Sequence, residues 1–183
     1  LSNDRIYRED EVHFSQRNIF FEYKVRESYS SDLDELVKVI ANTESVDRVV
    51  VLTTLAASAI SLEKALKDKL NKAGLDGVDV VIVHGDQDKF VKFDGMLNFC
   101  GKKDFETFNP QALVTNGAGN TGIDSDKVTE ILRAGVMMDL PTALQERGRL
   151  VRKDGMIGRI TIVFNLTSLL QCLYLLHGLN TKA

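Results

Sequence analysis

The chain has 183 residues, enough for one large domain with a sizeable core, and its 44% hydrophobic and 27% charged residues are ordinary for a globular protein. Its 23 Lys and Arg against 26 Asp and Glu give a net charge of −3, so bulk charge does not indicate nucleic-acid binding, which would need a local basic patch. Cys100 and Cys172 lie far apart and form no ligand-spaced cluster with the histidines, which argues against a metal site or a disulfide framework. We expect free thiols in an intracellular, reducing compartment, and the sequence does not separate nucleus from cytoplasm.

Short apolar strands alternate with amphipathic helices along the chain. Strands are predicted over residues 19–25, 48–53, 78–84 and 112–115, and helices over residues 31–41, 57–73 and 90–99. The second helix is followed by Gly74, a residue type that commonly ends helices. Continuous apolar strands joined by helices indicate a parallel sheet covered on both faces. The sequence therefore predicts one α/β domain.

The most apolar stretch lies near the end, over residues 163–179. The stretch is too short for a membrane span, and Asn165, Gln171 and His177 make it too polar for one. It is interpreted as a strand end followed by a buried helix. We expect no membrane partner.

A glycine-rich segment, TNGAGNTGID, follows the strand that ends at Thr115. In parallel α/β sheets ligands bind beyond the carboxyl ends of the strands, and glycines there let the backbone approach a ligand or simply turn the chain. The segment is not a Walker A loop, because no Gly-Lys-Ser/Thr follows, and it is not a dinucleotide fingerprint. On its own this segment leaves both readings open.

Residues 145–152 match the pattern Gln-x-x-Gly-Arg-x-x-Arg, which resembles motif VI of superfamily 2 helicases. Residues 115–124 resemble motif V, which ends in Gly-Ile-Asp. Further matches, in the order expected over residues 17–165, are the strand RVVVLTT (48–54), His84-Gly85, Phe99 and Asp139-Leu140-Pro141. Within this superfamily the chain resembles RecQ-like helicases, since Asn18-Ile19-Phe20 and Gln145-Glu146 are similar to their versions. One departure is that Thr115 and Gly122 are separated by one residue more than in the usual motif V, which leaves the register of residues 116–121 open.

The resemblance implies a RecA-like (P-loop NTPase-type) lobe with a mainly parallel sheet and helices on both faces. Residues 1–16 would be a linker or N-terminal extension, residues 17–165 the helicase C-terminal domain, and residues 166–183 a C-terminal helix and tail. We expect the chain to be cut from a longer protein.

The resemblance also assigns roles to individual residues. Catalytic roles fall to Arg149, Arg152 and Gln145; ATP contacts to Gly122, Asp124, Gln145, Arg149 and Arg152; nucleic-acid contacts to Thr115, Asn116 and His84; and no residue to a metal. Arg152 would be the arginine finger on the γ-phosphate, and Arg149 would tie the phosphate to the other lobe. Two guanidinium groups three residues apart on a short turn can point to one side and hold phosphate oxygens bidentately. The alternative for this segment is a solvated basic turn, and for His84 a strand-end histidine with a local hydrogen bond.

The function implied is the second motor lobe of an ATP-dependent nucleic-acid helicase, with DNA as the expected substrate and a first RecA-like lobe as partner. The chain has no Gly-Lys-Thr phosphate loop and no Asp-Glu-x-His pair, so the magnesium of Mg²⁺–ATP would be held by the first lobe. We therefore expect activity in a full-length enzyme and none in this chain alone. Two alternatives remain: a non-enzymatic nucleic-acid or protein interaction module derived from a helicase lobe, and a flavodoxin-like small-molecule binder, which leaves the motif VI pattern unexplained.

Overall fold

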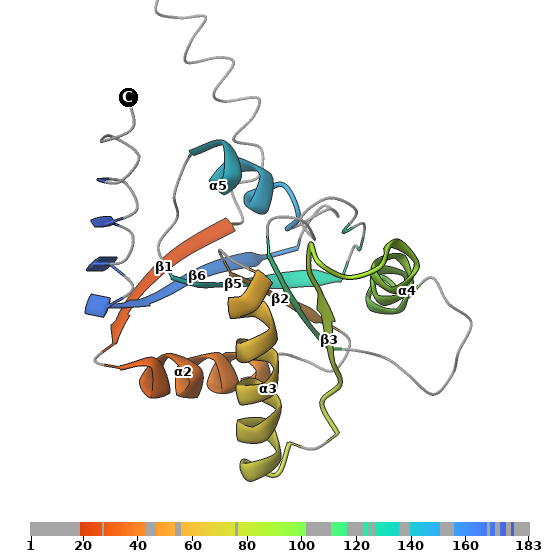
Figure 1. Ribbon diagram of the computed structural model, residues 1–183, viewed down its shortest axis with the longest axis horizontal. Helices are drawn as coiled ribbons and strands as arrows, with labels where there is room; N and C mark the ends of the chain where they lie inside the picture. Colours follow the sequence, from red (N-terminus) through yellow and green to blue (C-terminus); the bar gives the residue numbers. More distant parts are fainter. Residues whose placement is uncertain are drawn as a thin grey trace, which may run out of the picture.

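Six parallel strands form a single sheet in this computed structural model (Figure 1). The strands are β1 (Ile19–Arg26), β2 (Arg48–Leu52), β3 (Val80–Val83), β4 (Ala112–Thr115), β5 (Val128–Ala134) and β6 (Gly158–Asn165). Their order is β1-β6-β5-β2-β4-β3, and every neighbouring pair is parallel. The structure describes residues 19–26, 28–42, 47–53, 56–75, 77–101, 111–116, 123, 125, 127–135, 140–150, 156–167, 169–170, 173–174 and 177. The expected parallel α/β fold is confirmed.

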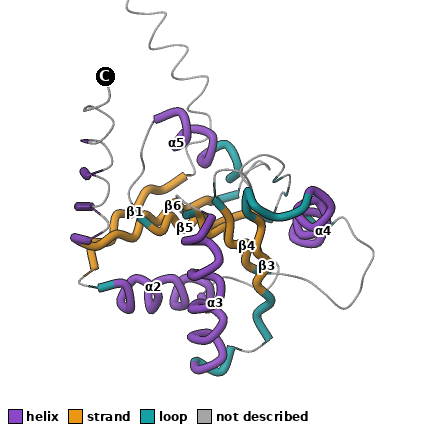
Figure 2. Tube along the Cα trace, in the orientation of Figure 1, coloured by secondary structure: helices purple, strands orange, loops and turns teal. Residues whose placement is uncertain are grey.

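Two helices cover one face of the sheet. These are α2 (Tyr29–Asn42) and α3 (Ala56–Lys72), which lie together below the strands in Figure 1 and are drawn as purple tubes in Figure 2. Each presents an apolar stripe at helical spacing, and the buried members of these stripes pack on Val49, Val51, Val114 and Leu132. Burial of this interface supplies the main core on that side.

The opposite face carries α4 (Lys89–Phe99) and α5 (Leu140–Arg147), which an ion pair joins to β5. The core on this face contains Phe99 of α4 and the strand residues that point to this side, among them Val50 and Leu52. It also contains Ile123 and Leu150. Both Ile123 and Leu150 are completely buried. They lie in the segments that resemble motifs V and VI, so a buried apolar side chain anchors each segment to this face of the sheet.

Most elements predicted from the sequence are confirmed with small changes in their bounds. The strand predicted over residues 78–84 is shorter, and Gly74 follows α3 with a φ of 73°, as a glycine that ends a helix does. The strand β5 and the helix α5 (Leu140–Arg147) were not predicted as separate elements. In β5, Glu130 and Arg133 interrupt the apolar run and hide the strand pattern.

The prediction of a buried helix after β6 is wrong for the described residues. Residues 166, 167, 169, 170, 173, 174 and 177 are helical, but Leu166, Leu170, Leu173 and Tyr174 are 53–77% exposed. No described element covers these side chains, so their apolar character does not bring them into the core. Within the described part of the chain, no helix is long and apolar enough to cross a membrane.

Candidate functional site

The segments that resemble motifs V and VI meet at one contact. Arg149 lies just beyond α5 and its Nη1 donates a hydrogen bond to the carbonyl oxygen of Ile123, at 3.3 Å. Ile123 is the middle residue of the Gly-Ile-Asp that resembles the end of motif V. Because Ile123 and Leu150 share one buried cluster, the two segments are joined by apolar packing as well as by the hydrogen bond. Arg149 and Ile123 therefore bring the segments that resemble motifs VI and V together.

The turn that carries Arg149 is built by tightening the end of α5. The amide of Gly148 bonds the carbonyl of Leu144 at 3.0 Å, four residues back. The amides of Arg149 and Leu150 then bond carbonyls only three residues back, at 3.1 Å each, which is the 3₁₀ pattern common at helix ends. This turn buries Leu150 completely and leaves Arg149 half-buried. Gln145, one turn earlier on α5, is exposed.

A buried ion pair fixes α5 to the sheet. Arg133 of β5 donates to the carboxylate of Glu146, and their side chains are 4% and 0% exposed. Arg133 points to the same face as Ile131 and Ile123, which is the face that α5 and Arg149 occupy. This pair positions the helix from which Arg149 emerges. Glu146 lies within the segment that matches motif VI, but Arg133 was not predicted as a site residue. The feature of the sequence that could have indicated Arg133 is a charged residue inside an apolar strand, six residues before Asp139.

Thr115 and Asn116 lie at the carboxyl end of β4. Thr115 is completely buried, its hydroxyl donates to the carbonyl of Asn116 at 3.2 Å, and its own carbonyl accepts from the amide of Thr53 at 2.8 Å. The bond from Thr53 ties the ends of β2 and β4 together, and the hydroxyl bond stays within the end of β4. Asn116 is half-buried, and its side-chain oxygen has no hydrogen-bond partner among the described residues.

His84 follows β3 at the same edge of the sheet and is 9% exposed. Its amide donates to Oε1 of Gln87 at 2.9 Å, and Nε2 of Gln87 donates to the carbonyl of Ile82 at 3.3 Å. This network closes the turn into α4. Nδ1 of His84 is buried without a hydrogen-bond partner in the described part of the chain, so the local turn does not use the imidazole.

Three of the predicted site residues, Gly122, Asp124 and Arg152, lie outside the described residues. Among the residues that the structure does describe, no group of three or more His, Cys, Asp or Glu side chains is arranged to hold a metal ion. The predicted absence of a metal ligand therefore stays a prediction for the whole chain. Of the predicted site residues that the structure describes, His84 and Asn116 follow β3 and β4 at the carboxyl edge of the sheet, and Arg149 bonds Ile123 in the segment that comes after β4.

Several solved structures are similar to this chain. The chain matches domain 2 of the DEAD-box helicase Mss116p, bound to an RNA duplex, with a TM-score of 0.62 and 19% identity, over 81% of this chain and 55% of that one. It matches the Mycobacterium smegmatis helicase Lhr, bound to ssDNA and AMP-PNP, with a TM-score of 0.63 and 16% identity, over 84% of this chain and 21% of that one. It matches the C-terminal domain of the DEAD-box protein Dbp5 with a TM-score of 0.62 and 17% identity, over 91% of this chain and 87% of that domain. The fold is that of a RecA-like α/β lobe.

At these identities the likeness concerns the fold, and the chain spans only part of the first two proteins. No protein-family model and no curated protein matches the sequence.

Proposed function

We propose that this chain is the second motor lobe of an ATP-dependent nucleic-acid helicase. The observation that carries the proposal is the hydrogen bond from Arg149 to Ile123, because it joins the segments that resemble motifs VI and V on a RecA-like fold. A basic turn that was merely solvated would not need a fully buried Leu150 or an ion pair beneath it. These features hold the arginine-bearing turn in one position, as a group that stabilises charge in a reaction must be held.

In the proposed reaction ATP and its magnesium lie between this lobe and a first lobe. Arg152 is the arginine finger that meets the charge developing on the γ-phosphate, and Arg149 ties the phosphate to the other lobe. Gly122, Asp124 and Gln145 complete the nucleotide contacts from this side. Planar guanidinium groups suit this task because they keep their charge and bind phosphate oxygens bidentately.

The nucleic acid is proposed to contact Thr115, Asn116 and His84 at the carboxyl edge of the sheet. Asn116 is half-buried and follows β4 at the edge of the sheet where ligands of parallel α/β sheets bind, which supports a ligand there. DNA as the substrate and a RecQ-like relationship rest on the sequence resemblance alone. The similar solved structures include RNA-bound and DNA-bound helicases, so both nucleic acids belong in the test.

A second candidate is a nucleic-acid or protein interaction module that keeps the fold of the lobe without the motor. The observation that favours it is the additional residue between Thr115 and Gly122. The two candidates predict different behaviour of a protein that carries a first lobe as well.

The test compares ATP hydrolysis by the isolated 183-residue chain and by a protein that also carries the first lobe, each with and without DNA or RNA. We expect no turnover by the isolated chain, because it has no phosphate loop or magnesium ligands, and nucleic-acid-stimulated turnover by the two-lobe protein. Phosphate release by the isolated chain would overturn the motor-lobe proposal. A two-lobe protein that binds nucleic acid but never hydrolyses ATP would favour the interaction module.

A further inference from the structure

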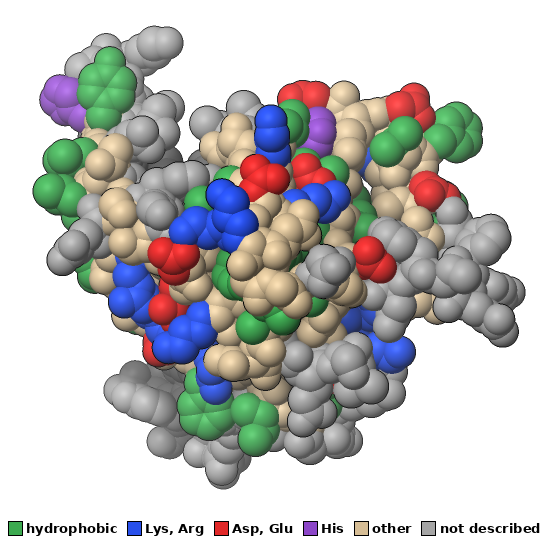
Figure 3. Space-filling model, turned by 90° about the horizontal axis from the view of Figure 1, so that it is seen from below, with side chains coloured by type: hydrophobic (Ala, Val, Ile, Leu, Met, Phe, Trp, Pro, Cys, Tyr) green, Lys and Arg blue, Asp and Glu red, His purple; other side chains and the backbone are tan. Residues whose placement is uncertain are grey.

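A cavity of about 510 Å³ opens on the α2 side of the sheet, away from the motif V and motif VI segments. It lies beyond the end of α2, beside the first residues of β5 and β6, so it is at the amino edge of these strands while the candidate site is at the carboxyl edge. Its lining residues are Glu22, Lys24, Glu35, Lys38, Val39, Asn42, Asp47, Thr129, Glu130, Ile157 and Arg159. Figure 3 views the molecule from the side of α2 and α3 and shows Lys and Arg side chains interleaved with Asp and Glu.

Glu130 is the group in this cavity whose charge is least compensated. Its side chain is 16% exposed, its Oε1 is 3.8 Å from Nε of Arg159, and its Oε2 is buried without a hydrogen-bond partner among the described residues. An ionised carboxylate in that position is costly unless a cation or a hydrogen-bond donor meets it. Burial accordingly raises the pKa of Glu130 to about 7.

The other charges of the cavity are already engaged or face solvent. Lys24 is bonded to Glu35, and its Nζ lies 3.2 Å from Oε1 of Glu22, so its positive charge is already paired with two carboxylates. Arg159 is 53% exposed and keeps much of its hydration. Lys38, the third cation of the lining, is exposed. These three cations therefore do not make the cavity an anion site.

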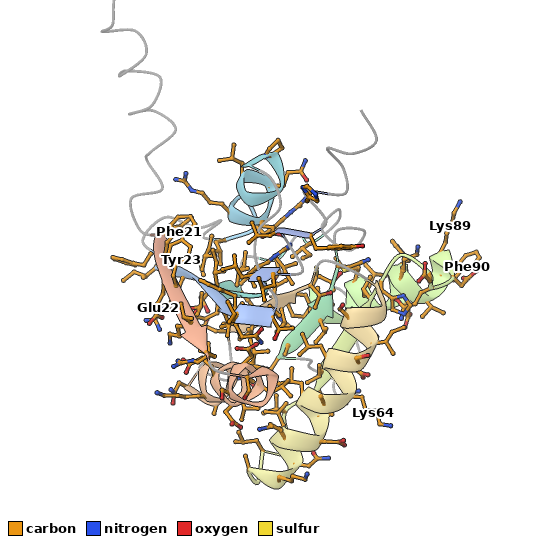
Figure 4. All side chains as sticks on the ribbon, turned by 60° about the vertical axis from the view of Figure 1, so that its left-hand side comes forward. Phe21, Glu22, Tyr23, Lys64, Lys89 and Phe90 are labelled. Atoms are coloured by element: carbon orange, nitrogen blue, oxygen red, sulfur yellow. The ribbon has the colours of Figure 1, made fainter. Side chains whose placement is uncertain are left out.

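The end of α2 adds negative potential to the same space. Asn42 is its last residue and lines the cavity, and the last turn of the helix contains no basic residue to offset the partial negative charge of its carbonyl groups. Asp47 lines the cavity from the start of β2. Figure 4 shows Glu22 on the α2 side of β1, while Phe21 and Tyr23 lie on the other side.

The apolar part of the lining sets the shape of the ligand. Val39 and Ile157 line the cavity alongside Glu130, so an alkyl chain can pack on them while its charged end reaches the carboxylate. We propose that this cavity binds a small organic cation, a primary ammonium or guanidinium group on a short alkyl chain, with Glu130 as its counter-ion. The proposal does not depend on the function proposed for the lobe.

Such a cation has two sources, a free amine or the Lys or Arg side chain of a peptide. The test follows the resonances of Thr129 and Glu130 by NMR in the 183-residue chain during titration with n-butylammonium, n-butylguanidinium or blocked single-residue Lys and Arg peptides. n-Butanol serves as an uncharged control of the same chain length. We expect saturable shifts with the cations and none with n-butanol, and the tighter of the free and peptide-linked forms identifies the source.

The pH dependence tests the role of Glu130 without a mutation. The charged groups that face it are Glu22, Lys24, Glu35, Lys38, Asp47 and Arg159. Because the ligand needs the ionised carboxylate, we expect affinity at least about tenfold higher at pH 8 than at pH 5.5, across the pKa of Glu130. A pH-independent affinity would overturn the proposal.

Glu130→Gln removes the charge and keeps the shape, and we expect it to abolish binding. Glu63→Gln is the matched control, since Glu63 lies on α3 and pairs with Lys67 outside the cavity. If Glu130→Gln does not fold, Glu130→Asp keeps the charge and should bind more weakly than wild type. Unchanged binding by folded Glu130→Gln, or equal binding of n-butanol, would refute a cation site.

Discussion

The buried ion pair between Arg133 and Glu146 gives the sharpest prediction on stability. Glu146→Gln keeps the size of the side chain but leaves the guanidinium of Arg133, 4% exposed, without its carboxylate. Breaking one partner of a buried pair typically costs about 3–5 kcal/mol of unfolding free energy. For a chain of this size that loss corresponds to a fall in Tm of about 6–20 °C. Replacing both partners with apolar residues, Arg133→Met with Glu146→Leu, should cost far less or even stabilise the fold, because neither charge is then buried alone.

The assay is a double-mutant cycle by urea unfolding of the wild type, the two single variants Arg133→Met and Glu146→Leu, and the double variant, with Glu146→Gln measured alongside. Glu63→Gln on α3 is the control, since its i,i+4 pair with Lys67 is worth only about 0.3–0.5 kcal/mol. We expect a coupling energy of about 2 kcal/mol or more between Arg133 and Glu146. Additivity of the two single variants to within about 0.5 kcal/mol would refute the view that this pair holds α5 on the sheet.

Two further predictions concern the core and the cavity. Glu130→Gln should stabilise the chain by about 2–3 kcal/mol at pH 8 and leave its stability unchanged near pH 4. The reason is that the pKa of the Glu130 carboxyl is raised from 4.5 to about 7 in the folded state, so the wild type loses stability as pH rises between those values. Equal effects at both pH values, measured by urea unfolding, would contradict this. Gly95→Ala should destabilise the chain by about 1–3 kcal/mol, because a Cβ there would lie 3.0 Å from Cγ2 of Val83. Gly77→Ala is the control and should have little effect, because no heavy atom lies within 4 Å of a Cβ at that position. Equal melting temperatures for the two variants would count against close packing of α4 on β3.

The fold could be predicted from sequence where patterns were uniform. The all-apolar runs in β2 and β4 and the helical spacing in α2 and α3 predicted the sheet and its α2–α3 face. The strand β5 was not predicted because the charged residues Glu130 and Arg133 interrupt its apolar pattern. In the folded chain Glu130 lines a cavity on one face of the sheet, and Arg133 pairs with Glu146 on the other. Neither the cavity nor the ion pair can be predicted from the local sequence, because residues from other elements form them.

The candidate site shows the same division. The resemblance of residues 145–152 to motif VI assigned Arg149 a role in the site, which stays a prediction, and the structure shows Arg149 bonded to Ile123. The spacing could not predict that Arg133 supports this arrangement, because the pair spans two elements. It also could not predict that Leu166 and Leu170 are exposed, since an apolar sequence does not specify which element covers it.

The central claim is that the turn after α5 supplies an arginine finger to ATP. Its most direct test is the single-turnover rate of ATP hydrolysis by the two-lobe protein with Arg152→Ala, with Lys72→Ala, exposed at the end of α3, as control. We expect a rate lower by about 10³-fold or more for Arg152→Ala, with unchanged melting and nucleotide affinity, and a normal rate for Lys72→Ala. A near-normal rate in folded Arg152→Ala would contradict it.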